Sequence, residues 1–189
     1  MEAFLVSMGI VALSEIGDKT QLLAIMLAAR FRKPWPIIAG ILTATLLNHA
    51  LAALLGQWIA NAIPRQWLSW ALALSFFAAA AWALKPDKLA EDDAPVASNH
   101  GVFVASVLSF FLAEMGDKTQ VATAMLAARF NVLLPVIAGT TIGMLIADVP
   151  AVFAGKAAGD RIPFKAIRIV AALLFVALGI TALWQPGRT

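Results

Sequence analysis

One seven-residue motif occurs twice in this chain, at positions that are 99 residues apart. The first copy runs from Glu15 to Gln21, the second runs from Glu114 to Gln120, and both read E-x-G-D-K-T-Q. Each copy lies within a long apolar stretch, where a charged side chain is energetically costly. The chain must therefore fold so that these acidic and basic side chains face one another, water or an ion.

The composition indicates a membrane protein. Of 189 residues, 61% are apolar and 13% are charged, whereas soluble domains carry roughly 25% charged residues. The chain has no cysteine, which excludes disulfides and thiolate metal sites. Apolar segments leave no room for a soluble catalytic domain, and nothing in the sequence indicates a nucleic-acid partner. The expected surroundings are a lipid bilayer.

Six apolar segments are each long enough, or nearly so, to cross a hydrocarbon core of ~30 Å as a helix. They lie at about Phe4–Ala29, Trp35–Leu55, Trp67–Leu84, Val102–Ala128, Val132–Gly155 and Ile167–Trp184. The segments lack the two-residue alternation of strands, which favours helices. The expected fold is an all-α membrane protein with six transmembrane helices.

The two halves of the chain are duplicates. When positions 15–64 are paired with positions 114–163, 21 of the 50 pairs are identical. We expect a first three-helix repeat at residues 1–84, a linker at 85–100 and a second three-helix repeat at 101–189. Because three is an odd number of spans, the second repeat enters the membrane from the opposite side, and the repeats are inverted.

The distribution of Lys and Arg gives the orientation. One predicted side carries nine of these residues outside the motifs: Arg30, Arg32, Lys33, Lys85, Lys88, Lys156, Arg161, Lys165 and Arg168. The other side carries three: Arg65, Arg129 and Arg188. By the positive-inside rule, the linker faces the cytoplasm and both termini face outwards.

The acidic residues of the two motifs predict a metal site. Glu15 and Asp18 are three residues apart and share one face of a helix, and the inverted repeats bring the two motif helices together at the midplane. Oxygen ligands suit a hard divalent cation such as Mn²⁺, Ca²⁺ or Mg²⁺. The candidate ligands are Glu15, Asp18, Gln21, Glu114, Asp117 and Gln120.

The remaining motif residues are expected to support this site. We interpret Lys19 and Lys118 as counter-charges, and Thr20 and Thr119 as supporting residues. The glycines Gly17 and Gly116 allow a close backbone approach or a break in the helix. A sequence such as Asp18-Lys19-Thr20-Gln21 is also typical of a helix N-cap, so the motif can alternatively serve to restart a broken helix.

Three buried polar residues lie outside the motifs: Asn48, His49 and Asp148. His49 and Asp148 occupy equivalent positions in the two halves. They fit a proton relay, since histidine and a perturbed carboxylate both titrate near neutral pH. A hydrogen-bonded contact between helices is the alternative interpretation.

The duplicated E-x-G-D-(K/R)-(T/S) motif resembles that of a small cation/proton exchanger family, which includes bacterial manganese exporters and Golgi manganese/calcium exchangers. The resemblance covers essentially the whole chain. It implies a secondary transporter, not an enzyme, that exports a divalent cation in exchange for protons, with Glu15, Asp18, Glu114 and Asp117 as the binding acids. It favours Mn²⁺ over Ca²⁺ as the substrate, with H⁺ as the counter-ion and no permanently bound cofactor. The expected location is a bacterial inner membrane, as a monomer or homodimer.

Other functions also fit parts of the pattern. A Ca²⁺/H⁺ exchanger needs the same oxygen ligands, and a cation channel or an amino-acid exporter can be built on a related scaffold. An intramembrane aspartyl protease would use Asp18 and Asp117 as a catalytic pair. The additional glutamates and the adjacent lysines favour a charge-compensated ion site over such a pair.

Overall fold

All regular structure in the described part of the chain is helical. The computed structural model describes residues 1–85, 101–154 and 164–184, and within them the all-α expectation is confirmed. The helices are α1 (Glu2–Glu15), α2 (Lys19–Phe31), α3 (Pro34–Ala62), α4 (Arg65–Ala83), α5 (Val102–Glu114), α6 (Lys118–Phe130), α7 (Leu133–Ala154) and α8 (Phe164–Trp184). By length and apolar composition, three described segments can cross a membrane: Pro34–Ala62, Gln66–Ala83 and Leu133–Phe153.

The first and fourth predicted spans are each divided into two helices, so the motif glycines break the helix, one of the two possibilities that the sequence left open. The break between α1 and α2 lies at Ile16–Asp18, and that between α5 and α6 lies at Met115–Asp117. The cause is the backbone of the motif glycine, which has φ 83° at Gly17 and φ 75° at Gly116. A right-handed helix requires a negative φ and cannot continue through such a residue.

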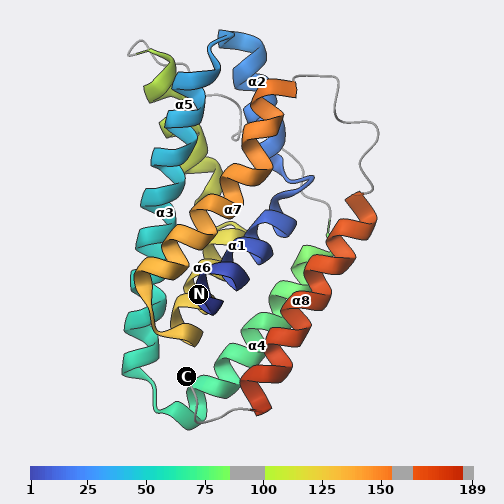
Figure 1. Ribbon diagram of the computed structural model, residues 1–189. Helices are drawn as coiled ribbons and strands as arrows, with labels where there is room; N and C mark the ends of the chain where they lie inside the picture. The colour runs from blue at the N-terminus through green and yellow to red at the C-terminus, as the bar shows by residue number, and fades with distance from the viewer. Residues whose placement is uncertain (86–100, 155–163, 185–189) are drawn as a thin grey trace.

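The first helix of each half packs on a helix of the other half, α1 on α7 and α5 on α3 (Figure 1). Glycines make both contacts close. A Cβ added at Gly139 would overlap the Phe4 carbonyl oxygen, and one added at Gly40 would lie 2.5 Å from Ser106 Cβ. These glycines occupy equivalent positions in the two halves, so equivalent close contacts hold the halves together.

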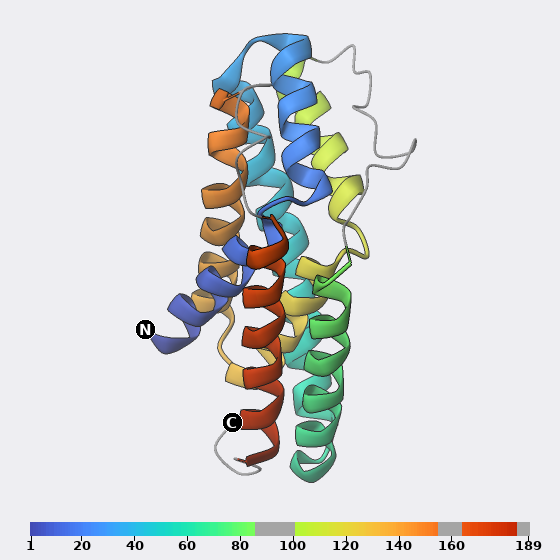
Figure 2. The same cartoon turned by 90° about the vertical axis from the view of Figure 1, so that its right-hand side faces the viewer.

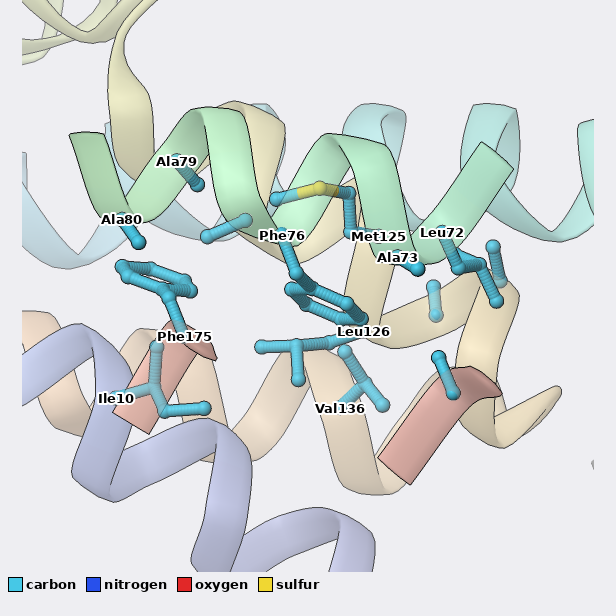
Figure 3. Packing of buried hydrophobic residues seen from close by; sticks show 14 of the residues in the cluster. Ile10, Leu72, Ala73, Phe76, Ala79, Ala80, Met125, Leu126, Val136 and Phe175 are labelled. Atoms are coloured by element: carbon cyan, nitrogen blue, oxygen red, sulfur yellow. The ribbon is translucent and has the colours of Figure 1, made fainter. Parts of the chain in front are cut away.

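Helices α4 and α8 form a pair along one side of the molecule, side by side in both views (Figures 1 and 2). Their contact includes the rings of Phe76 and Phe175, whose centroids are 6.5 Å apart. Figure 3 shows these rings in the larger apolar core, together with side chains such as Ile10 of α1 and Leu126 of α6. This core fixes α1, which precedes the first break, and α6, which follows the second.

Large apolar side chains remain exposed on the outer faces of the helices. Leu74 and Trp67 on α4 and Leu173 on α8 are all exposed. Outward-facing leucine and tryptophan are expected where lipid, rather than water, surrounds the helices. Most of the proposed linker (85–100) lies outside the described residues, as do Lys88, Lys156, Arg161 and Arg188 of the charge count.

Candidate metal centre

A tight turn forms each helix break. In the first motif, Ile16 has φ −65° and ψ 115°, Gly17 has φ 83°, and the Asp18 N–H donates to the Glu15 carbonyl at 3.0 Å. These are the features of a type II turn, which requires a positive φ at its third residue and therefore favours glycine there. The second motif repeats the turn, since Asp117 N–H donates to the Glu114 carbonyl at 3.0 Å. The backbone conformation of the turn thus explains why glycine precedes aspartate in the motif.

The two glutamines hold the turns closed. Gln21 Oε1 accepts the Gly17 N–H, and Gln120 Oε1 accepts the Gly116 N–H, both at 2.8 Å. Asp18 also acts as the N-cap of α2, because its Oδ1 accepts the Lys19 N–H at 2.8 Å. The motif therefore does restart a helix after the break, as one interpretation of the sequence expected. This role does not explain why the acidic side chains are buried.

Three of the four motif acids lie together. Carboxylate oxygens of Glu15, Asp18 and Asp117 lie within 4.8 Å of one another, so the cluster combines residues from both motifs. Glu15, Asp18, Glu114 and Asp117 are exposed by 0%, 1%, 1% and 5% respectively. Buried carboxylates at such distances repel one another unless a cation or protons compensate their charge.

The helix that follows each break begins at the motif lysine, and Lys118 supplies part of the compensation. Its Nζ lies 3.2 Å from Asp18 Oδ1, in the other motif, and its side chain is buried. Lys19 is near enough to Glu114 for their charges to interact. In addition, α2 and α6 begin at the two motifs, and the partial positive charge at a helix N-terminus favours nearby anions.

Glu114 is not among the three clustered acids, and residues of α3 donate hydrogen bonds to it. Thr45 Oγ1 donates to Glu114 Oε1 at 2.8 Å, and Asn48 Nδ2 donates to Glu114 Oε2 at 3.3 Å. Glu15 has a different environment, because Thr20 of its own motif donates to its Oε2 at 2.6 Å. The second motif threonine, Thr119, donates instead to Asp117 Oδ2 at 3.4 Å. The duplicated acids are thus equivalent in sequence but not in their hydrogen bonds.

Asn48, His49 and Asp148 are completely buried, and they have different surroundings. Asn48 Nδ2 contacts the Phe111 carbonyl at 3.1 Å in addition to Glu114. Among the described residues, neither nitrogen of His49 and neither carboxylate oxygen of Asp148 has a hydrogen-bond partner. Asp148 is near enough to Asp18 and Glu114 for their charges to interact.

Thr45 was missing from the candidate residues derived from sequence. It precedes Asn48 by three residues on α3, and positions three apart lie on the same helix face. A threonine in that position relative to a buried asparagine was therefore the available signal. Only the packing of α3 on α5 shows that both side chains donate to the same carboxylate.

The fold and the site together define a helical membrane protein with a buried acidic centre built on two broken helices, an arrangement typical of ion transporters. The chain belongs to the family described as divalent cation/proton antiporter GDT1, whose family model matches residues 3–91 and 102–188. It is therefore a member of a transporter family.

Individual relatives agree with this assignment. The chain is 51% identical over 181 residues to a Vibrio cholerae protein named "Putative manganese exporter", covering 95% of this chain and 90% of the relative. A GDT1-like protein of Synechocystis sp. is 29% identical, with 97% and 98% coverage. GDT1-like protein 5 of Arabidopsis thaliana is 28% identical, with 98% and 97% coverage. No solved structure matches the chain significantly.

Proposed function

We propose that this protein exports Mn²⁺ from the cytoplasm in exchange for protons, with the buried acids of the two motifs as the shared binding site. The observation that carries the proposal is the grouping of Glu15, Asp18 and Asp117 within 4.8 Å, in a chain of an antiporter family. The name of the Vibrio cholerae relative supports Mn²⁺ as the exported ion.

The ligand chemistry agrees with this ion. Carboxylate oxygens bind Mn²⁺, Ca²⁺ and Mg²⁺, and Glu15, Asp18 and Asp117 supply such oxygens from both motifs. Glu114 completes the acidic centre from a position fixed by α3. Gln21 and Gln120 already accept backbone N–H groups through their side-chain oxygens. We therefore assign these glutamines to stabilising the turns rather than to binding the ion.

The same acids provide the coupling to protons. A carboxylate must be deprotonated to bind a metal ion, so metal binding releases protons and protonation releases the metal. In the metal-free site, Lys118 neutralises part of the charge through Asp18. An arriving cation displaces this ammonium group from Oδ1, and Lys118 returns when the cation leaves.

Transport also requires a change in access, because the four motif acids are almost completely buried. We propose that residues 1–84 and 101–189 form inverted three-helix repeats, six spans in all, that rock against each other. The equivalent contacts at Gly40 and Gly139 support this pseudo-symmetry. The positive-inside rule gives the orientation, with the linker in the cytoplasm and both termini outside.

Flux measurements with purified protein in liposomes test this function. With a pH-sensitive dye inside, we expect added Mn²⁺ to enter and internal protons to leave in wild type, since exchange runs in both directions. Asp117→Asn should abolish both fluxes. Thr43→Val is the matched control, because the Thr43 hydroxyl donates to the Ala39 carbonyl of its own helix. Mn²⁺ flux without proton movement would identify a channel, and Ca²⁺ exchange without Mn²⁺ exchange would identify a calcium antiporter.

A further inference from the structure

Asp148 of α7 is a buried carboxylate that lacks a hydrogen-bond partner within the described part of the chain. Its side chain is completely buried, and neither oxygen has a donor among the described residues. Buried polar atoms are almost always hydrogen-bonded, and buried charges are paired or bind metals. The two oxygens of Asp148 therefore require a partner that the described side chains do not provide.

Contacts with α2 place this carboxylate beside the acidic centre. Gln21 Nε2 donates to the carbonyl oxygen of Ala147 at 2.9 Å, which fixes the start of α2 on α7 next to Asp148. The Thr20 hydroxyl lies beside both Asp148 and Glu15, and its one proton is donated to Glu15 Oε2 at 2.6 Å. Asp148 also lies within range of the charges of Glu15, Asp18 and Glu114.

We propose that Asp148 is a further ligand of the transported ion, contributed by a helix outside the duplicated motifs. This inference rests on the proposed function and extends its binding site. Hard divalent cations take six or more oxygen ligands, whereas three carboxylates that each bind through one oxygen supply half of that number. Asp148 adds a carboxylate on the α7 side of the cluster, and no described residue donates a hydrogen bond to either of its oxygens.

The proposed site is consequently asymmetric. The position equivalent to Asp148 in the first half is His49, which is also completely buried and has no partner for either ring nitrogen among the residues that the structure describes. Oxygen ligands are required by Ca²⁺, whereas imidazole suits later transition metals such as Co²⁺. A carboxylate at 148 therefore makes the site more tolerant of Ca²⁺ than an imidazole would.

Calorimetric titration of the purified full-length protein with Mn²⁺, Ca²⁺ and Co²⁺ tests the ligand role. Asp148→Asn should weaken Mn²⁺ binding by about tenfold or more, without lowering the unfolding temperature of the metal-free protein. Asp148→His should raise the preference for Co²⁺ over Ca²⁺ by a similar factor, which only a residue in contact with the ion can do. Thr141→Val is the matched control, because Thr141 is a buried α7 residue whose hydroxyl also has no hydrogen-bond partner in residues 1–85, 101–154 and 164–184.

The outcomes separate this inference from the proposed function. If Asp18→Asn loses Mn²⁺ binding while Asp148→Asn binds like wild type, Asp148 is not a ligand and the transport proposal stands. If Asp148→Asn lowers the metal-free unfolding temperature and leaves both affinity and metal preference unchanged, Asp148 has a structural role only. If wild type binds none of the three ions, the transport proposal and this inference both fail.

Discussion

Lys118 Nζ lies 3.2 Å from Asp18 Oδ1, so a lysine of the second motif forms an ion pair with the aspartate of the first. The pair crosses between the two halves of the chain at a buried position. Each motif therefore depends on the other for the balance of its charges.

Replacing Lys118 by methionine should separate the two roles of this pair. Removing one partner of a buried ion pair costs about 3 kcal/mol or more, so the metal-free protein should unfold at a lower temperature. Mn²⁺ should then stabilise Lys118→Met more than wild type, because the ion no longer competes with the ammonium group for Asp18. Thermal unfolding in detergent with and without Mn²⁺ measures both effects. If Mn²⁺ raises the unfolding temperature of Lys118→Met and of wild type by the same amount, the lysine and the metal do not compete for Asp18.

The turn at Gly116 should reject any side chain. Its φ of 75° lies in the left-handed region, which costs an L-residue roughly 1–2 kcal/mol, although a Cβ there would meet no atom of the described residues within 4 Å. Gly116→Ala should therefore destabilise through backbone strain alone.

Gly9→Ala provides the control for this substitution. Gly9 lies inside α1 and also has no atom within 4 Å of an added Cβ, so alanine there should be neutral or stabilising by about 0.4–1 kcal/mol. Equal effects of the two substitutions on chemical unfolding would contradict the assigned turn.

The hydrogen bonds to Glu114 predict an effect of Thr45→Val. Leaving a buried acceptor without its donor costs about 1–3 kcal/mol, so the variant should be destabilised and should transport Mn²⁺ with a higher KM. Thr43→Val, on the same helix, should change both quantities little, because Thr43 is half-buried and bonds to its own helix. If both variants behave alike, Thr45 does not position Glu114.

Close packing of α3 on α6 predicts a severe effect of Gly56→Ala. A Cβ at Gly56 would overlap the backbone carbonyl oxygen of Ala124, and backbone cannot yield as a flexible side chain does. Overpacking of this kind typically costs about 1–3 kcal/mol, so the unfolding temperature should fall below those of both wild type and Gly9→Ala. If Gly56→Ala unfolds at the wild-type temperature, α3 and α6 can move apart at this position without a loss of stability.

The sequence predicts the helical class, the duplication and the buried acids because each leaves a local pattern. Apolar runs identify helices, and the repeated motif identifies equivalent positions. The glycines at 17 and 116 indicated possible breaks, but a glycine alone does not distinguish a broken helix from a close contact. The positive φ at each glycine decides the question.

The grouping of the side chains could not be predicted from the same patterns. The motif makes Glu15 equivalent to Glu114 and Asp18 equivalent to Asp117. The structure instead groups Glu15, Asp18 and Asp117 and directs Glu114 towards Thr45 and Asn48. This difference arises because α3 carries hydrogen-bond donors at positions 45 and 48, where the second half has Met144 and Ala147. Helix packing decides which acids those donors reach.

Anomalous X-ray scattering from crystals of the protein grown with Mn²⁺ tests the central claim most directly, because it locates the ion itself. We expect one manganese peak at bonding distance from carboxylate oxygens of Glu15, Asp18 and Asp117, and the peak should be lost in Asp117→Asn crystals. A manganese peak elsewhere in wild type, with none at these three residues, would contradict the proposed ion site.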